Sequence, residues 1–336
     1  ASYLWSHRKG IQLRGRAKTF SRYFALSLAA SIVTVWAGYR FSFGIPFLDR
    51  PGLIPEIQRR LHAGPGTLLF VKWLSRIPVP APEFFEGVGS LAMNNAEGRR
   101  AFFLGEISTT GWRTFFPILT LVKIPLAFLV LSAGGLLSAM RSARDGRTRW
   151  DAPLPCLLSL VMLGAVVPSS INIGLRHLLP MFPLLAIVAA DGARWLNRSL
   201  PRLVNVAVVA SLLVWYSLSS LGAHPDYLAY FNALAGSHPE RIVVDSDLDW
   251  GQDAKRLVAV LREAGFPPVS VAYNGWVDLE KRGVLNVTMP EEKHPVTGLV
   301  AISVHEMAML DYSWLKGYEP ARRIGKSILL YRIPPS

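Results

Sequence analysis

The sequence predicts an α-helical membrane bundle of about five spans, followed by a small extracytoplasmic α/β domain. Of its 336 residues, 51% are hydrophobic, more than is usual for a soluble enzyme, and 18% are charged, too many for a chain wholly buried in lipid. The charge is also uneven, because residues 1–222 carry 24 Lys+Arg and 9 Asp+Glu, whereas residues 223–336 carry 12 and 14. We therefore expect a transmembrane region at 1–223, with a long external loop at 40–114, and an α/β domain at 224–336.

Five apolar segments approach the length of about 20 residues that a helix needs to cross a bilayer. The fourth is the least apolar, since it contains two prolines and Asp191. The segments are YFALSLAASIVTVWAGY (23–39), FFPILTLVKIPLAFLVLSAGGLLSAM (115–140), LPCLLSLVMLGAVVPSSI (154–171), LLPMFPLLAIVAADGARWL (178–196) and VNVAVVASLLVWYSLSSLGA (204–223).

Basic residues between these segments set the expected orientation. The N-terminal leader and the stretches RSARDGRTRW (141–150) and NRSLPR (197–202) lie on one side if all five segments span, and the positive-inside rule puts that side in the cytoplasm. A signal peptide is the alternative for the first segment, but no clean small-x-small cleavage site follows it. The prediction is a multi-pass protein of the cytoplasmic (inner) membrane with an external C-terminal domain.

The external parts contain further predicted elements. LIPEIQRRLH (53–62) has the pattern of an amphipathic surface helix, and PVPAPEFFEG (78–87) that of a proline-rich turn. In the C-terminal domain, GQDAKRLVAVLREAG (251–265) predicts a helix that closes at Gly265. The predicted strands are RIVVDS (241–246), VSVAYN (269–274), LVAISV (299–304) and SILLYRI (327–333).

Three basic residues are candidates for binding phosphate at the outer membrane face. Lys123 lies roughly 12 Å along the second segment from Phe115, where a charge marks either a function or a side chain that snorkels to the interface. Arg176 and His177 fall in a very short external loop, where Arg176 could also contact lipid headgroups. Together these residues suit a phosphate or pyrophosphate, because arginine offers a planar donor fork and lysine a point charge. Glu106 is a weak candidate for a base or an ion-pair partner of Arg176 or Lys123.

The stretch DSDLDWGQD (245–253) partly imitates a calcium loop. Its acids fall at relative positions 1, 3 and 5, but its glycine is at position 7 rather than 6, and Arg256 stands at position 12, where calcium needs a bidentate glutamate. No metal ligand is therefore assigned, and a divalent metal remains an alternative.

Two other interpretations of this stretch remain open. Asp249 or Gln252 would begin a helix, since acids there satisfy free N–H groups and the helix dipole. Alternatively the stretch recognises an acceptor or headgroup, or forms a domain interface, because strand-turn-helix junctions are where α/β folds place ligands. The residues involved are Asp245, Asp247, Asp249, Trp250 and Gln252.

Three stretches together resemble bacterial membrane glycosyltransferases of the GT-C class, similar to the protein O-mannosyltransferase and lipid A aminoarabinose transferase families. The resemblance covers roughly residues 75–333, with Ser237 where a second glycine is common and Asp247 where Asn is common. The stretches are FFLGEISTTGWRTFFPILTLVKIPLAF, GLRHLLPMFPLLAI and HPDYLAYFNALAGSHPERIVVDSDLDWGQDAKRL.

The resemblance implies transfer of a sugar from a polyprenyl-phosphate donor to a lipid or glycan acceptor at the outer membrane face. Lys123, Arg176 and Glu106 would contact the carrier phosphate. The class uses an Asp of its first external loop as base, which would lie upstream of the matched residues and outside this chain. No cofactor is firmly implied, and no nucleic acid partner is expected.

Two other functions remain possible from the sequence. One is a non-catalytic, membrane-anchored binding or assembly protein for a polysaccharide or a protein partner. The other is a transporter, suggested by proline-broken helices, although no inverted repeat supports it.

Overall fold

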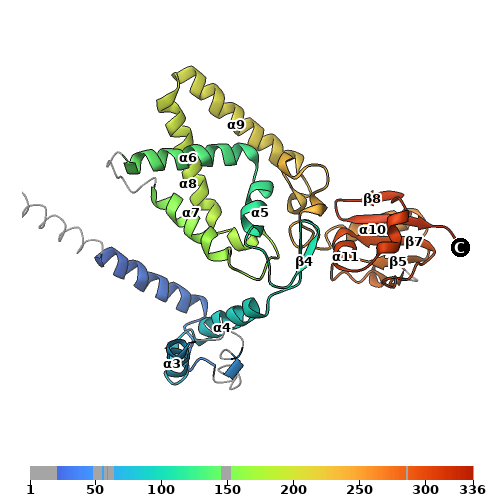
Figure 1. Cartoon of the computed structure of the whole chain (residues 1–336), viewed down its shortest axis with the longest axis horizontal. Coiled ribbons are helices and arrows are strands. Elements are labelled where there is room, and N and C mark those ends of the chain that lie inside the picture. The colour runs from blue at the N-terminus through green and yellow to red at the C-terminus, as the bar shows by residue number, and fades with distance from the viewer. Residues whose placement is uncertain are drawn as a thin grey trace, which may run out of the picture. The chain divides into compact units, whose positions relative to one another are not determined.

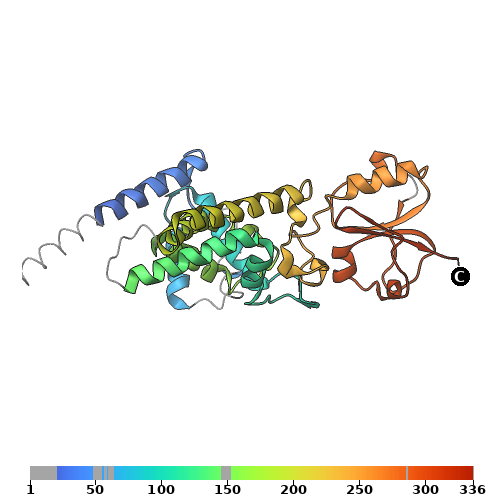
Figure 2. The same cartoon turned by 90° about the horizontal axis from the view of Figure 1, so that it is seen from above.

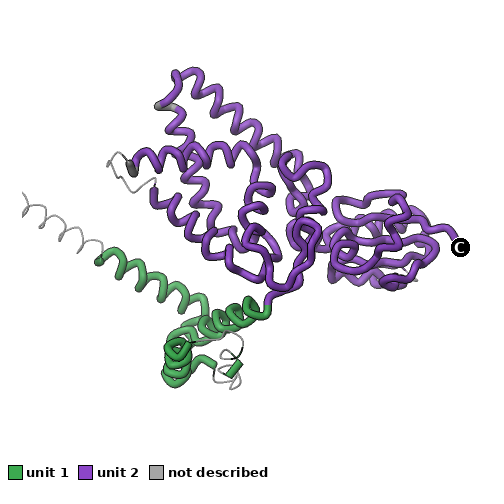
Figure 3. Tube along the Cα trace, in the orientation of Figure 1, with its two compact units in different colours: residues 1–97 green, residues 98–336 purple. Residues whose placement is uncertain are grey.

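The structure is a computed structural model that describes residues 21–47, 55–56, 59, 64–144, 153–284 and 287–335. The chain divides into two compact units, residues 1–97 and 98–336 (Figure 3). The second unit contains the longer helices α6, α8 and α9 together with a five-stranded sheet.

The described part of the first unit is mainly helical, with helix at 21–38. The predicted turn at 78–87 is wrong beyond its first residues, because α4 begins at Pro82, where proline loses only an N–H that the first turn of a helix does not need. The predicted helix at 53–62 lies almost entirely outside the described residues. The elements are β1 (Phe43–Gly44), α3 (Pro65–Leu74), β2 (Val79–Pro80) and α4 (Pro82–Glu97), with β1 and β2 antiparallel.

The second unit begins with a hairpin and a sharply bent helix pair. Strands β3 (Ala101–Phe103) and β4 (Glu106–Ser108) form the hairpin. Helices α5 (Phe115–Lys123) and α6 (Leu126–Arg144) then meet at 117°. The break follows from Pro125, since the residue before a proline is driven out of the helical region and Ile124 is extended.

Three further helices pack with α6: α7 (Pro153–Val166), α8 (Met181–Ser199) and α9 (Arg202–Gly222) (Figures 1 and 2). Helices α6 and α8 make the most extensive contact. Glycines permit it, because a Cβ at Gly135 would overlap the Val188 carbonyl and one at Gly192 the Leu131 carbonyl.

The prediction of a five-span membrane bundle is wrong. Among the described residues only α9 is long and apolar enough to cross a membrane, with the bent pair α5–α6 as a second candidate if it is counted as one span. Helix α7 has 14 residues, so it is about 21 Å long, shorter than a hydrocarbon core of about 30 Å. Helix α8 starts after Pro180 and carries the buried Asp191, which pairs with Arg194.

The C-terminal part of the second unit is a sheet with the order β6-β5-β7-β9-β8. The three strands β6, β5 and β7 are parallel, and β9 is antiparallel to both β7 and β8. The predicted helix at 251–265 and the strands at 269–274, 299–304 and 327–333 are confirmed. Their observed bounds are α10 (Ala254–Glu263), β5 (Val269–Ala272), β6 (Val287–Thr288), β7 (Gly298–Ser303), β8 (Arg322–Ile324) and β9 (Ile328–Ile333).

The predicted strand at 241–246 is wrong. Leu248 N–H and Asp249 N–H both donate to the Asp245 carbonyl, at 2.8 and 3.1 Å, so the backbone forms successive turns. Val243 is fully buried in the cluster around α5 rather than in the sheet.

The other short elements are α11 (Val304–Met309) and the 3-10 helices at Leu175–Leu178, Tyr227–Ala229, Ala233–Ala235, Pro239–Arg241, Glu280–Arg282 and Ser313–Gly317.

Candidate functional site

Lys123, at the end of α5, forms hydrogen bonds with two loops. Its Nζ donates hydrogen bonds to the Leu228 carbonyl at 2.7 Å and to the Asp247 carbonyl at 2.6 Å, and lies 4.2 Å from the ring centroid of Phe231. Two of the three ammonium protons are therefore used within the protein. The geometry gives Lys123 a positioning role for the aspartate stretch.

Asp247 joins that stretch to the loop before α8. Its carboxylate accepts from the Leu175 N–H at 3.0 and 3.2 Å, and it is buried. The close approach depends on Gly174, at φ 145°, where a Cβ would lie 2.5 Å from Ser246 Oγ. Burial raises the pKa of Asp247, and the Lys123 charge opposes this shift.

Arg176 and His177 follow immediately and are both exposed. The Arg176 guanidinium lies 5.2 Å from the ring centroid of Trp250, in cation–π contact. The His177 ring instead meets Phe116 edge-on, with centroids 6.1 Å apart. The structure thus pairs Arg176 with Trp250 and Lys123 with Asp247.

Glu106 is separate from these contacts. It is exposed in the β3–β4 hairpin, and no ion pair joins it to Lys123 or Arg176, all three of which are described residues. Glu106 therefore does not form the predicted ion pair with either Arg176 or Lys123 in this structure.

Asp249 is the most deeply buried of the three alternating acids, at 1% exposure. Its Oδ1 accepts from the Gly251 N–H at 3.2 Å, and its carbonyl accepts from Asn274 Nδ2 at 3.1 Å. Burial raises its pKa, and the hydroxyl of Ser303 is the largest opposing influence. Asp249 therefore ties the aspartate stretch to the end of β5.

The predicted helix start at Asp249 or Gln252 is wrong, because α10 begins at Ala254. Gln252 instead accepts from the Trp250 N–H and donates to the Leu248 carbonyl, both at 2.8 Å, which closes a local turn. The residue before the helix, Asp253, does not cap it either. Its carboxylate accepts from the backbone N–H groups and the side chain of the β8–β9 turn.

A pocket of about 190 Å³ lies beside Asp245, where parallel strands β5 and β7 reach their carboxyl ends. Asn274 follows β5 and His305 follows β7, so the pocket occupies the position at which α/β sheets bind ligands. Asp245 is buried, and its Oδ1 accepts from the Ser246 N–H at 2.6 Å. The lining residues are Arg99, Arg100, Asp245, Trp250, Asn274, Gly275, Trp276, His305 and Met309.

Two tryptophans distinguish this pocket. Trp276 is 98% exposed and Trp250 46% exposed, although each offers a large apolar ring. Both line the pocket together with the charged side chains of Arg99 and Arg100. Large apolar rings that are partly exposed to solvent are suited to ligands whose surface is partly polar and partly apolar.

Sequence reasoning missed Arg99, Arg100, Asn274, Trp276 and His305. These residues come from three separate stretches of chain, and only folding brings them together. A signal for two of them was visible, because Asn274 and His305 directly follow predicted strands and the carboxyl ends of parallel strands share one edge. No comparable pattern marked Arg99 and Arg100.

No group of three or more His, Cys, Asp or Glu side chains that could hold a metal ion occurs among the described residues. The three alternating aspartates take up separate contacts: Asp245 with Ser246, Asp247 with Leu175 and Asp249 with Gly251.

The comparisons with known proteins give no family. No family model, no curated protein and no solved structure matches the chain. Inferences about function therefore depend on the residues and on the geometry of the site.

Proposed function

We propose that this chain is part of a membrane glycosyltransferase that takes a sugar from a polyprenyl-phosphate carrier, and that the pocket beside Asp245 binds the sugar-phosphate headgroup. The observation that carries the proposal is the grouping of Arg99 and Arg100 with the rings of Trp250 and Trp276 around one polar pocket. Guanidinium groups match phosphate oxygens, and indole rings pack against the C–H faces of sugars.

The individual roles follow from the contacts. Arg99 and Arg100 line the pocket and bind the phosphate. Arg176 does not line the pocket, but it lies against the pocket residue Trp250 and adds positive charge beside it. Asp245 and His305 provide a carboxylate and an imidazole ring that form hydrogen bonds with the sugar hydroxyls. Lys123 supports the site through the Asp247 carbonyl instead of meeting the phosphate itself.

The membrane part of the proposal depends on α9. This helix has 21 residues and a mean hydropathy of 1.7 over its most apolar window, and it directly precedes the loops that Lys123 anchors. We propose that α9 attaches the chain to the cytoplasmic membrane, with the pocket on the outer side. A carrier whose tail lies in the bilayer would then present its phosphate near the membrane surface.

The test is direct binding of a panel of short-chain polyprenyl-phosphate hexoses and pentoses to the full chain in detergent. We expect Arg176→Ala, Trp250→Ala and Asp245→Asn each to weaken binding by about tenfold. The matched control is Arg282→Gln, because Arg282 is exposed in the same unit and does not line the pocket. Binding in all three variants equal to that of the unmodified chain would refute the headgroup site.

A non-catalytic binding or assembly protein is the second candidate. The observation that favours it is the 98% exposure of Trp276, which is typical of a surface that docks a polysaccharide or a protein. The two functions separate in a transfer assay with the carrier and a lipid or glycan acceptor. Release of carrier phosphate with formation of a new glycosidic bond supports the enzyme, and tight binding without any release supports the binding protein.

A further inference from the structure

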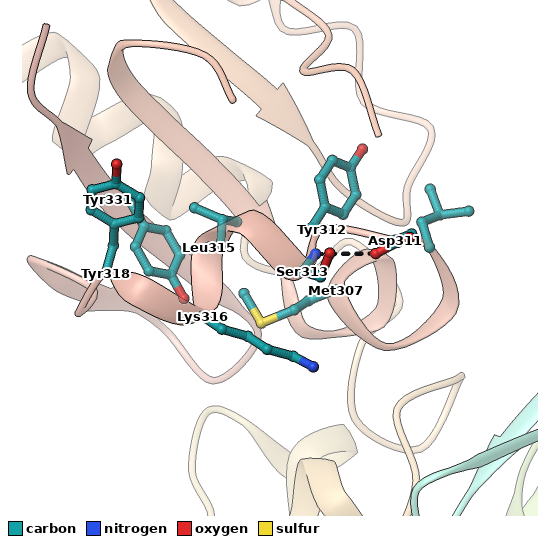
Figure 4. Close-up of a pocket in the computed structure, with 9 residues that line it drawn as sticks. Met307, Asp311, Tyr312, Ser313, Leu315, Lys316, Tyr318 and Tyr331 are labelled. Carbon is teal, nitrogen blue, oxygen red and sulfur yellow. Dashed lines mark hydrogen bonds between the residues drawn. The ribbon is translucent and has the colours of Figure 1, made fainter. Parts of the chain in front are cut away.

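A second pocket, of about 290 Å³, lies within the C-terminal sheet region and is separate from the site beside Asp245. It is a partly open pocket lined by residues of α11, the 3-10 helix Ser313–Gly317, strand β9 and the turns between them, and its side chains are drawn in Figure 4. Both pockets touch α11, but they share no lining residue.

Tyr331 of β9 gives this pocket an unused polar group. The residue is 4% exposed, and its hydroxyl makes no hydrogen bond to any described residue. Its neighbour Tyr312, buried to a similar degree, donates its hydroxyl to the Pro290 carbonyl at 3.3 Å. The Tyr331 hydroxyl oxygen itself remains accessible to solvent, so it can donate to and accept from a molecule in the pocket. Tyr331 therefore offers the pocket one hydrogen-bonding group that the protein does not use.

The remaining polar groups lie around the rim. The Tyr318 ring is 38% exposed and lies beside Tyr331 in Figure 4, and its hydroxyl also has no hydrogen-bond partner among the described residues. Lys316 is exposed at the same end. The Asp311 carboxylate accepts from the Ser313 N–H at 3.2 Å, the contact shown dashed in Figure 4.

The charged and apolar side chains of this pocket indicate which class of ligand fits it. The pocket contains one cation and one anion, Lys316 and Asp311, so it offers no net attraction for phosphate. Met307 and Leu315 add apolar walls beside the tyrosine rings. A pyranose ring meets these demands together, because its faces carry C–H groups and its edges carry hydroxyls that both donate and accept.

We propose that this pocket binds a neutral pyranose unit of a glycan. Assigning that glycan as the acceptor depends on the proposed transferase function, whereas sugar binding itself does not. The pocket lies in the same structural unit as the headgroup site, so one chain would hold both donor and acceptor.

The experiment measures binding of the methyl glycosides of glucose, mannose and galactose to the full chain by saturation-transfer NMR and titration calorimetry, with inorganic phosphate as the anion probe. We expect at least one glycoside to bind and phosphate not to compete with it. Tyr331→Phe removes only an unpaired hydroxyl, so we expect folding to be retained and glycoside affinity to fall by roughly fivefold. Tyr318→Ala should weaken binding further.

The control is Tyr227→Phe, which removes a tyrosine hydroxyl elsewhere in the same unit. It should leave glycoside affinity unchanged. The proposal is overturned if no glycoside binds, if Tyr331→Phe and Tyr318→Ala bind as the unmodified chain does, or if phosphate displaces the glycoside. Because no carrier is present, these results are independent of carrier binding, which we expect Tyr331→Phe to retain.

Discussion

Lys123 illustrates how one charged side chain can hold distant loops together through their backbone carbonyls. A lysine at the end of an apolar helix looks from the sequence like a phosphate ligand. Its ammonium instead reaches two carbonyls that lie more than 100 residues away along the chain. These contacts fix the positions of the loops at Leu228 and Asp247. They thereby also position Asp245, which belongs to the same stretch as Asp247 and lines the pocket.

Replacing Lys123 by methionine should destabilise the second unit. The change keeps an apolar stem but leaves two carbonyls without their donor, and hydrogen bonds to charged groups contribute about 1.5–3 kcal/mol each. We expect a loss of about 2–4 kcal/mol of unfolding free energy, measured by chemical denaturation in detergent. Lys255→Met on α10, where the lysine is exposed, is the control. Equal stabilities of the two variants would contradict the anchoring role.

Asp249 predicts how stability depends on pH. Because burial raises its folded pKa above the ordinary 3.8, the folded state binds the proton more tightly than the unfolded state does. The contribution of Asp249 to stability therefore falls as pH rises from about 3.8 to the folded pKa and stays low above it.

The corresponding variant is Asp249→Asn, which remains neutral at every pH. Relative to the unmodified chain it should gain stability at pH 8, and the gain should shrink as pH falls towards 4. Unfolding midpoints at several pH values measure this difference. Asp278→Asn is the opposite control, since hydrogen bonds from Lys281 lower the pKa of Asp278. A gain for Asp249→Asn that grows towards low pH would show that burial does not govern this carboxyl.

At the scale of elements, the proposed membrane attachment depends on helix α9. Leu213 lies in its middle at 53% exposure, and Leu203 lies at its start at 85% exposure, so an arginine at either place removes little packing. A charge at a bilayer centre costs about 2.5–3.5 kcal/mol, whereas one near the end can snorkel. We expect Leu213→Arg to reduce the fraction that resists carbonate extraction from membranes, and Leu203→Arg to retain it. Equal extraction of both would argue against α9 as a span.

The elements also show which sequence signals are reliable. Helix α10 was predictable because Leu257 and Leu261 recur at helical spacing and both are fully buried. The apolar run at Val243 and Val244 did not allow a strand to be distinguished from a turn, because a short buried run is compatible with both. The decisive contact there is the cluster around α5, far away in sequence.

The same limit explains the overestimated number of spans. Hydropathy counts apolar residues in a window, but a span also needs unbroken helix over the full length. Pro125 divides one window at a 117° bend, and another window forms the 14-residue α7. The pocket residues were harder still to predict, because Arg99, Trp276 and His305 become neighbours only through the fold.

At the scale of the whole molecule, the two units should differ in local stability. In the described part of the first unit, helix α4 has no buried residue, whereas Val300, Ala301 and Ile302 of β7 are completely buried. Amide protons in such cores exchange only on extensive unfolding. We expect hydrogen-exchange mass spectrometry in detergent to show much slower exchange for peptides of β7 than for peptides of α4. Similar exchange rates in the two sets of peptides would mean that burial within this chain does not determine the local unfolding of β7 and α4.

The short outer strands of the sheet have a consequence for self-association. Strand β6 at one edge has two residues, and β8 at the other has three, of which Arg322 and Arg323 are exposed. Long, flat edges recruit further strands and lead to fibrous aggregates, whereas short and charged edges stop that growth. At high local concentration the protein would therefore resist polymerising through this sheet.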